Sequence, residues 1–298
     1  MLEIKRILWA TDGSKVSEEA LKYSVFIAEN FGSDVNGLHV IPKPEKVLFK
    51  SEFRDWTVKV EENLKSELSA LAKKLEAKGI SFKGIVLQGI PSFEILEYAR
   101  REDADLIVLG KSGHGLLDRL LVGSTTLKVL RESGVPVLTV KKRDGEGDIK
   151  IDNILVPLEI SDKTNSALIY AIELARKIKA KIDVLYVFRL DVYTYEVPAS
   201  TLVLDDLIKF SSKELARRVD EVIQKQSESS DDKGLEISTR VIQAINPAIA
   251  ISDYASSNDI DLIVINTHGR KGISRLILGS VTEKVIQESS CAVLALKP

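Results

Sequence analysis

Residues 110–124 read G-K-S-G-H-G-L-L-D-R-L-L-V-G-S, and this stretch decides the fold. The apolar run Leu106–Leu109 precedes it, and a helical pattern from Thr125 to Glu132 follows it. Glycine lets backbone N–H groups approach an anion, and a helix start adds unpaired N–H groups and the positive end of the helix dipole. Ser124 can cap the helix or offer its hydroxyl to a phosphate oxygen. The stretch therefore predicts a phosphate site between a buried strand and a helix.

Two common phosphate motifs do not fit this stretch. A Walker A loop needs a glycine five residues before the G-K-S, where this chain has Asp105. A Rossmann fingerprint places its glycines near the first strand, whereas this loop follows a late one. The observed spacing is Gly110, Gly113, Gly123 and Ser124, which resembles the nucleotide-binding signature of the universal stress protein family. The loop alone is also compatible with a purely structural turn and helix cap.

Length and composition describe an ordinary globular protein. The 298 residues favour two domains, and the chain is 44% hydrophobic and 29% charged. A net charge of −2 gives no electrostatic footprint for nucleic acid or an anionic membrane. Cys291 is the single cysteine, which suits a reducing compartment. The N-terminus enters a strand directly, and no apolar run is long enough to span a bilayer. We expect a cytoplasmic, soluble protein.

The chain repeats itself. Residues 4–8 match residues 151–155 at an offset of 147, and residues 105–108 match residues 261–264 at an offset of 156. The second copy thus carries nine extra residues, the difference between the two offsets, and they fall between Arg189 and Pro247. A repeat of this length is a duplicated domain. We predict domains at residues 1–143 and 149–298, the first with the intact motif and the second with a degenerate one, joined by a short acidic linker that contains glycine.

Apolar strand patterns alternate with helical patterns in both copies. This alternation predicts parallel sheets with right-handed crossovers. The expected fold class is α/β, with two consecutive three-layer α/β/α domains, each built on a five-stranded parallel sheet of Rossmann-like type. In such sheets the ligand lies beyond the carboxyl ends of the strands, where Asp12, Val40, Gly89 and Gly110 follow or end successive strands. These positions should converge on one crevice.

The resemblance now covers nearly the whole chain, which looks like a tandem universal stress protein. It implies that Asp12 contacts the adenosine portion of a nucleotide, that the Val40 backbone pairs with adenine, and that the glycines and Ser124 hold phosphates, sometimes with a divalent metal. The implied ligand is ATP or another adenine nucleotide such as AMP, with or without Mg²⁺. The residues themselves leave alternatives open. Asp12 also suits a helix cap or an Asx turn. Val40 could be no more than an ordinary strand end, since any strand here would end in an apolar residue. The nucleotide-binding residues expected in the first copy are Asp12, Gly13, Ser14, Val40, Gly89, Gly110, Lys111, Gly113, His114, Gly123, Ser124 and Thr125.

The second copy departs from the pattern. Glu159 replaces Asp12, Ile160 replaces Gly13, Asn266 replaces Gly110 and Ala244 replaces Gly89. Asparagine tolerates positive φ, but a longer acid and added bulk would crowd the adenosine end. We expect a second, weaker site formed by Glu159, Val187, Asn266, Gly269, Gly279 and Ser280.

Neither a metal site nor a catalytic constellation is expected. The three histidines lack cysteine or histidine companions at metal-ligand spacing, and no Ser-His-Asp order recurs in both copies. Phosphoryl transfer needs a positioned base and charge neutralisation. The loop offers Lys111 and Arg119 to neutralise charge, while Asp12 and Asp118 are the only acids placed to hold magnesium or activate water. The leading hypothesis is a stress or signalling protein that binds adenine nucleotide without dedicated catalysis. The alternatives are a slow ATPase or nucleotidyl-transfer enzyme, and an interaction scaffold without nucleotide.

Each copy ends in an apolar strand, at residues 135–140 and 291–296. An open apolar edge is an aggregation liability. The resemblance implies that relatives with one domain pair such edges between chains, so we expect the two copies to pair antiparallel within one chain, with a homodimer as the alternative. Pro136 lacks an N–H and should lie at the start of its strand or face away from the partner strand. No nucleic acid or membrane partner is expected.

Overall fold

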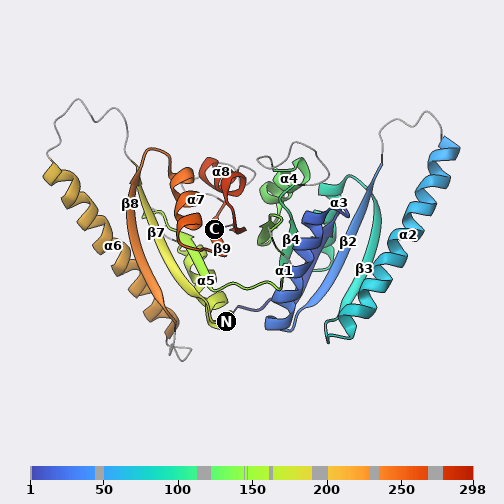
Figure 1. Ribbon diagram of the computed structural model, residues 1–298, viewed down its shortest axis with the longest axis horizontal. Coiled ribbons are helices and arrows are strands. Elements are labelled where there is room, and N and C mark those ends of the chain that lie inside the picture. Colours follow the sequence, from blue (N-terminus) through green and yellow to red (C-terminus); the bar gives the residue numbers. More distant parts are fainter. Residues whose placement is uncertain are drawn as a thin grey trace. The chain divides into compact units, whose positions relative to one another are not determined.

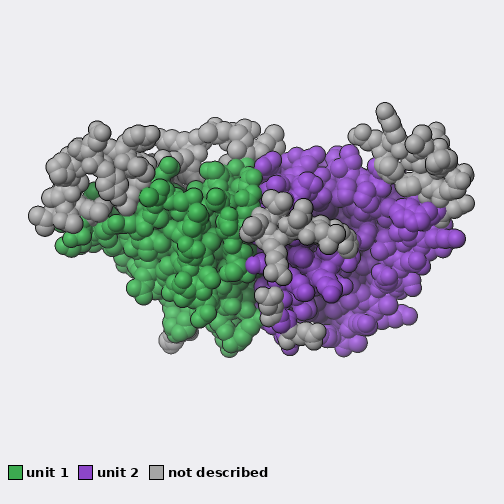
Figure 2. Space-filling model, turned by 45° about the horizontal axis from the view of Figure 1, so that its top comes forward, with its two compact units in different colours: residues 1–2, 150–298 green, residues 3–149 purple. Residues whose placement is uncertain are grey.

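The computed structural model of the chain describes residues 2–43, 50–112, 122–143, 145, 147–160, 164–189, 201–227, 235–267 and 278–297, with side chains outside 50–55, 201–204 and 227. Residues 3–149 form one compact unit, and residues 150–298 together with residues 1–2 form the other (Figure 2). Each unit contains five of the described strands and has its own hydrophobic core. Among the helices that the structure describes, none is long and apolar enough to cross a membrane.

The first unit alternates strands and helices along the chain (Figure 1). All its strand pairs are parallel, in the order β3-β2-β1-β4-β5, which confirms the predicted fold class. Its elements are β1 Arg6–Thr11, α1 Lys15–Phe31, β2 Asp34–Pro42, α2 Lys50–Glu76, β3 Phe82–Gly89, α3 Pro91–Arg101, β4 Leu106–Gly110, α4 Ser124–Glu132 and β5 Val137–Val140.

The core of the first unit lies around its two central strands, β1 and β4. Ile7 and Leu8 of β1 and Ile107 and Val108 of β4 have no exposed surface. Right-handed crossovers place α1 and α2 on one face of the sheet and α3 and α4 on the other, so both faces are covered. A strand buried on both faces has to be apolar at every position, which explains the continuous apolar runs in the sequence.

The second unit repeats this plan, with all described strand pairs parallel in the order β10-β9-β6-β7-β8. One difference concerns the first helix of the unit. At the offset of 147, its first residue Ser166 corresponds to position 19, whereas α1 begins at Lys15. The helix therefore starts about one turn later. The elements are β6 Asn153–Pro157, α5 Ser166–Ile178, β7 Lys181–Arg189, α6 Thr201–Ser227, β8 Ile237–Ala244, α7 Pro247–Ser257, β9 Leu262–Asn266, α8 Ser280–Glu288 and β10 Ala292–Leu296.

The repeated aspartate before β4 and β9 has a structural role. Asp105 Oδ2 accepts hydrogen bonds from the N–H groups of Lys5 and Arg6, at 2.8 and 2.9 Å. Asp261 Oδ2 accepts from two consecutive N–H groups just before and at the start of β6, at 2.8 and 3.0 Å. Each carboxylate thus ties the start of the unit's first strand to the start of a neighbouring strand. The acid that precedes the apolar run belongs to the fold, at the end of the sheet opposite the predicted crevice.

Arg143, just before the segment predicted as a linker, is bound to a helix of the first unit. The Arg143 guanidinium pairs with Glu19 of α1, whose carboxylate is buried, and it also donates to the carbonyls of Gly147 and Asp148 at 2.8 and 3.3 Å. Pro136 precedes β5 as predicted, and its carbonyl accepts from Ile107 N–H at 3.0 Å.

Candidate nucleotide site

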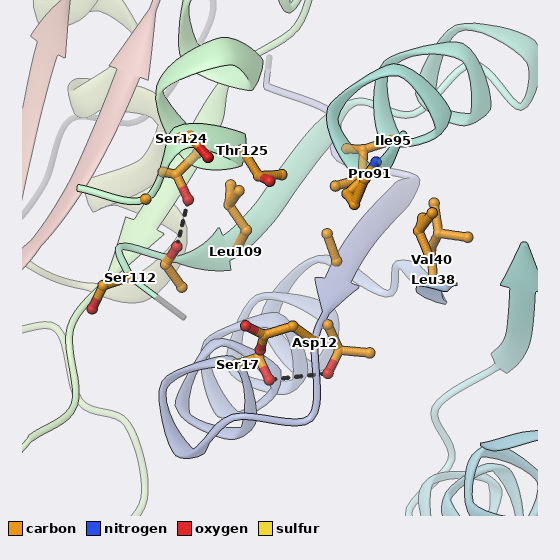
Figure 3. Close-up of a pocket in the computed structure, with 15 residues that line it drawn as sticks. Asp12, Ser17, Leu38, Val40, Pro91, Ile95, Leu109, Ser112, Ser124 and Thr125 are labelled. Atoms are coloured by element: carbon orange, nitrogen blue, oxygen red, sulfur yellow. Dashed lines mark hydrogen bonds between the residues drawn. The ribbon is translucent and has the colours of Figure 1, made fainter. Parts of the chain in front are cut away.

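A pocket of about 260 Å³ lies in the first unit beyond the carboxyl ends of β1, β2 and β4 (Figure 3). It is lined from one side by the start of α3 and from another by the start of α4. The predicted site residues that it brings together are Asp12, Val40, Gly110, Gly123, Ser124 and Thr125. Residues far apart in the sequence thus meet where the strand order of a doubly wound sheet places a ligand crevice.

The turn after β1 fixes the position of Asp12. Gly13 adopts a left-handed conformation with φ of 78°, which a residue without a Cβ accepts at no steric cost. Asp12 Oδ1 accepts from Ser14 N–H at 3.0 Å, and Ser14 Oγ in turn caps α1 by accepting from Ser17 N–H at 3.2 Å. Asp12 therefore forms the Asx turn that the sequence left open and also lines the pocket. Gly13 and Ser14 shape this turn but do not line the pocket.

The backbone of β2 alternates in direction between its two neighbouring strands. Asp34 N–H donates to Lys5 O on the β1 side, at 2.8 Å. Val35 N–H donates to Ser81 O on the β3 side, at 2.9 Å. In a parallel ladder both polar groups of a residue point to the same neighbour, and the direction changes at every residue. The N–H and C=O of Val40 therefore face the β1 side.

The hydrogen-bond ladder between β1 and β2 ends before the position at which an N–H of the first strand would donate to the Val40 carbonyl. The last registered pair is Thr11 with His39, while β2 continues beside β3. The N–H that would extend the ladder to the Val40 carbonyl belongs to Gly13, and it donates to Thr11 Oγ1 at 3.2 Å instead. The turn after β1 thus leaves a backbone acceptor at the pocket edge, where a base with an amino group can donate to it.

The opposite side of the pocket is the start of α4. Gly123 is the N-cap residue and makes no side-chain cap. Ser124 is the first helical residue, so it does not occupy the cap position, which was one of the two roles that the sequence left open for it. Gly123 N–H donates to Lys111 O at 2.9 Å, and Thr126 Oγ1 donates to Gly110 O at 2.9 Å. These two bonds hold the helix start against the end of β4. The first-turn N–H groups and the Ser124 and Thr125 hydroxyls are the donors available to an anion.

Two glycines of the motif serve different purposes. A Cβ on Gly110 would lie 2.9 Å from Val16 Cγ1, so this glycine permits the close approach of β4 to α1. A Cβ on Gly123 would meet nothing closer than 3.7 Å, so the fold itself leaves room there. The absence of a side chain at Gly123 keeps the pocket wall open for a ligand.

Other predicted residues lie elsewhere. The Lys111 side chain is 6% exposed and does not line the pocket, while its N–H donates to Val140 O at 2.7 Å. Gly89 ends β3, next to the pocket but outside its lining. Gly113 and His114 lie outside the described residues, as do Asp118 and Arg119.

Several lining residues escaped the sequence interpretation. Ser17 shares a hydrogen bond of 3.0 Å with Thr11 at the floor of the pocket. Pro91 and Ile95 lie one helical turn apart on α3, and this spacing directly after a strand end could have indicated them. The lining residues absent from the predicted set are Ala10, Thr11, Ser17, Leu38, Pro91, Ile95, Leu109, Ser112 and Thr126.

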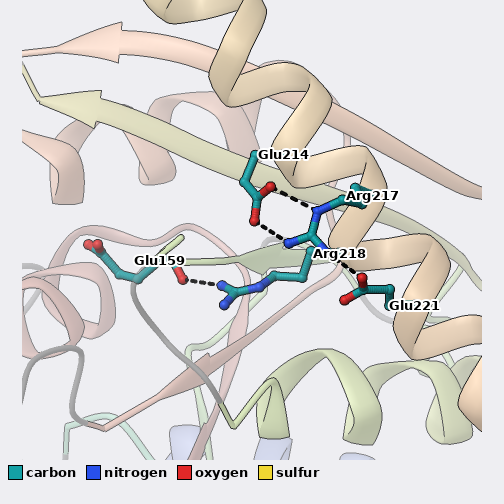
Figure 4. Close-up of polar contacts among 5 residues, drawn as sticks. All are labelled: Glu159, Glu214, Arg217, Arg218 and Glu221. Carbon is teal, nitrogen blue, oxygen red and sulfur yellow. Dashed lines mark hydrogen bonds and ion pairs between the residues drawn. The ribbon is translucent and has the colours of Figure 1, made fainter.

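The second unit is built differently at the predicted adenosine end. Glu159 follows β6, and its carbonyl accepts from Arg218 Nη1 of α6 at 3.0 Å (Figure 4). The Asn266 side chain accepts from Ser166 Oγ at 2.8 Å, so it connects the end of β9 to the start of α5. Val187 lies in β7 as Val40 lies in β2.

The other end of the second predicted site resembles its counterpart. Gly279 is the N-cap of α8 with φ −60° and ψ 139°, against φ −60° and ψ 145° at Gly123. Ser280 is the first helical residue, like Ser124. Thr282 Oγ1 donates to the carbonyl of Asn266 at 2.7 Å. Gly269 lies outside the described residues.

The titratable groups outside the first pocket include a surface ion-pair network on α6 and a half-buried thiol. On α6, Arg217 pairs with Glu214 and Glu221, and the hydrogen bond from Arg217 lowers the pKa of Glu214 (Figure 4). Exposed pairs of this kind contribute little to stability. Burial raises the pKa of the Cys291 thiol to about 11. Among the described residues, no group of three or more His, Cys, Asp or Glu side chains could hold a metal ion.

These observations define a tandem α/β protein with two doubly wound units, one of which carries a pocket at the position typical of nucleotide sites. The family model described as universal stress protein family matches residues 3–141 and again residues 150–297. The chain therefore belongs to the universal stress protein family, with two consecutive copies of the family domain.

Individual relatives agree with this assignment. Universal stress protein MJ0531 of Methanocaldococcus jannaschii is 37% identical over 142 residues, which cover 46% of this chain and 82% of the relative. A universal stress protein of Mycolicibacterium smegmatis is 24% identical over 299 residues, covering 98% of this chain and 97% of the relative. The crystal structure of a universal stress protein from Archaeoglobus fulgidus has a TM-score of 0.71 at 24% identity, covering 99% of this chain and 97% of that one, and shows the same fold.

Proposed function

We propose that the first unit binds an adenine nucleotide, ATP or AMP, and that the chain acts in stress response or signalling through this binding. The observation that carries the proposal is the pairing of two features in one pocket. The Val40 carbonyl lies beyond the β1 ladder at one end, and the open helix start at Gly123 lies at the other. A purine with an amino group suits the first feature, and a phosphate chain suits the second.

The same pocket favours binding over turnover. Asp12 is the one carboxylate among its described lining residues, and its Oδ1 already accepts from Ser14 N–H. Phosphoryl transfer needs a positioned base and charge neutralisation around the reacting phosphate. A slow ATPase remains the alternative function, with Mg²⁺ as an optional companion of the nucleotide. Following product formation after native purification separates the two, because a binding protein returns its nucleotide unchanged.

A valine at Gly123 tests the binding site directly. The glycine has room for a Cβ in the fold, with the nearest atom at 3.7 Å, so Gly123→Val should fold while its side chain enters the ligand space. We expect calorimetric affinity for ATP to weaken at least about tenfold, roughly 1.4 kcal/mol. Gly134→Ala is the matched control, because a Cβ there meets nothing within 4 Å and Gly134 does not line the pocket. Equal ATP affinity in the two variants would contradict the assigned site.

The ligand itself can be identified without choosing it in advance. The full chain is purified natively, denatured and filtered, and the released small molecules are analysed by mass spectrometry. An adenine nucleotide near one equivalent per chain is expected. A chain that releases no nucleotide and gives no heat with ATP or AMP would favour the interaction scaffold.

A further inference from the structure

Glu94 lies beside the pocket on the first turn of α3. It directly precedes Ile95 and follows Pro91 by three residues, and both of these line the pocket. The side chain is half-buried. Its carboxylate has no hydrogen-bond or ion-pair partner among the residues that the structure describes. A half-buried carboxylate that accepts no hydrogen bond is costly unless a ligand or water donates to it.

The end of β3 is shaped around this carboxylate. A Cβ on Gly89 would lie 2.2 Å from Glu94 Oε1, so the missing side chain at Gly89 provides the space that the carboxylate occupies. Gly89 is paired with Pro42, and Leu87 is paired with Val40. Residues two apart on a strand face the same side, so the carboxylate lies on the face of the sheet to which the Val40 side chain points.

The second unit changes both positions together. Gly89 corresponds to Ala244 at the end of β8, and Glu94 corresponds to Ala250 on α7. The cavity-forming glycine and the carboxylate that fills it are thus absent from the same copy. That copy also lacks Asp12 and Gly13, which are replaced by Glu159 and Ile160. Glu94 therefore belongs with the residues that distinguish the adenosine end of the first unit.

We propose that Glu94 selects the base of the nucleotide. Its carboxylate accepts a hydrogen bond from the exocyclic amino group of adenine, and it repels the oxo group that hypoxanthine and guanine carry at the same position. Gly89 acts through Glu94 by leaving space for its carboxylate. This inference rests on the proposed binding of an adenine nucleotide in the first unit.

ATP and ITP test the assignment, since they differ at this position of the base. Affinities for both are measured by calorimetry on the full chain, for wild type, Glu94→Ala, Glu94→Gln and Gly89→Ala. Glu97→Gln is the matched control, because Glu97 lies on the same helix but is paired with Arg100 at the surface. Wild type should prefer ATP by at least about tenfold, since a hydrogen bond to a charged group is lost with ITP.

Glu94→Ala should reduce this preference at least about fivefold, mainly by weakening ATP. Glu94→Gln should strengthen ITP, because an amide N–H can donate to the oxo group. Gly89→Ala should resemble Glu94→Ala, because the new Cβ displaces the flexible carboxylate. A preference that stays at the wild-type value in both Glu94 variants overturns the inference while the proposed function stands. A wild-type chain that binds neither nucleotide overturns both.

Discussion

Tyr98 and Tyr254 occupy the same position in the two copies, 156 residues apart, but their hydroxyls have different surroundings. Tyr254 Oη donates to Asp183 Oδ2 at 3.0 Å, and the other oxygen of this carboxylate accepts from Ser238 Oγ at 2.6 Å. The Tyr98 hydroxyl is buried and has no hydrogen-bond partner among the described residues. Replacing each tyrosine with phenylalanine should therefore change stability in different directions.

The expected magnitudes follow from what each hydroxyl contacts. A hydrogen bond to a charged group contributes about 1.5–3 kcal/mol, and Asp183 keeps Ser238 when Tyr254 is lost. Tyr254→Phe should thus destabilise the second unit by about 1–2 kcal/mol. An unsatisfied buried polar group costs about 1–3 kcal/mol, so Tyr98→Phe removes a penalty and should be neutral or stabilising by up to about 1 kcal/mol. For a unit of this size, each kcal/mol shifts the melting temperature by about 2–4 °C.

Both variants are made in the full chain and compared by calorimetric melting. Hydrogen exchange read by mass spectrometry then assigns each change to residues 3–149 or to residues 150–298. Ser238→Ala serves as a control that removes the other hydrogen bond to Asp183. If Tyr98→Phe destabilises its unit as much as Tyr254→Phe does, the Tyr98 hydroxyl has a partner in solution and the reasoning is refuted.

The two phenols also predict a loss of stability in alkali. Burial raises the pKa of Tyr98, and burial together with the hydrogen bond to Asp183 raises the pKa of Tyr254. The pKa of a tyrosine in the unfolded chain is about 10, so the native state holds the phenolic protons more tightly. The resulting stabilisation is complete below about pH 10 and is lost as the pH rises through the folded pKa values. A double phenylalanine variant should show a shallower alkaline decline in melting temperature.

Three further predictions concern other parts of the chain. Native Cys291, whose raised pKa reflects burial, should react with Ellman's reagent at pH 8 at least about 100-fold more slowly than in denaturant, and equal rates would contradict its burial. Titration of the full chain with ATP should show one strong site, and two equal sites per chain would rule out the asymmetry between the units. Isolated residues 1–143 should dimerise through the β5 edge at high micromolar concentration, whereas a monomer in sedimentation would contradict pairing of the last strands.

The fold was predictable because its signals are local and repeated. Buried strands such as residues 106–109 are apolar at every position, and the duplicated pattern supplied each assignment twice. Boundaries were less accurate. The helix after the phosphate motif begins at Ser124, one residue before the predicted start at Thr125, because hydroxyl residues on both sides of the boundary do not mark it. The role of Asp105 was also missed, since the N–H groups that it accepts from lie about 100 residues earlier in the chain.

The site residues that directly follow or end a strand were predictable from the sequence. Those whose position depends on side-chain packing were less predictable. Asp12 and Gly110 were found because each directly follows or ends a strand. The burial of Lys111 was not predicted, because a lysine beside glycines in a phosphate motif suggests an exposed cation. The sequence left open whether Ser124 caps the helix or offers its hydroxyl to a phosphate. The cap position belongs to Gly123, and this one-residue difference depends on backbone angles that the sequence does not specify.

The two copies differ most clearly in backbone geometry at the adenosine end of the site. At the predicted phosphate end, Gly279 and Ser280 have the same arrangement as Gly123 and Ser124. At the adenosine end, the first helix starts about one turn later.

Other changes at that end point the same way. Ile160 replaces a glycine with φ of 78°, a conformation that a β-branched residue disfavours. Arg218 holds the chain after β6, and the Gly89 and Glu94 pair becomes Ala244 and Ala250. The second unit has kept the backbone geometry of a helix start that suits an anion and has changed the parts that would recognise a base. It has also lost the Thr125 hydroxyl, because Val281 stands at that position. The physical basis of the expected asymmetry is therefore mainly base recognition, and backbone contacts of a phosphate with the helix start alone should not distinguish the two units.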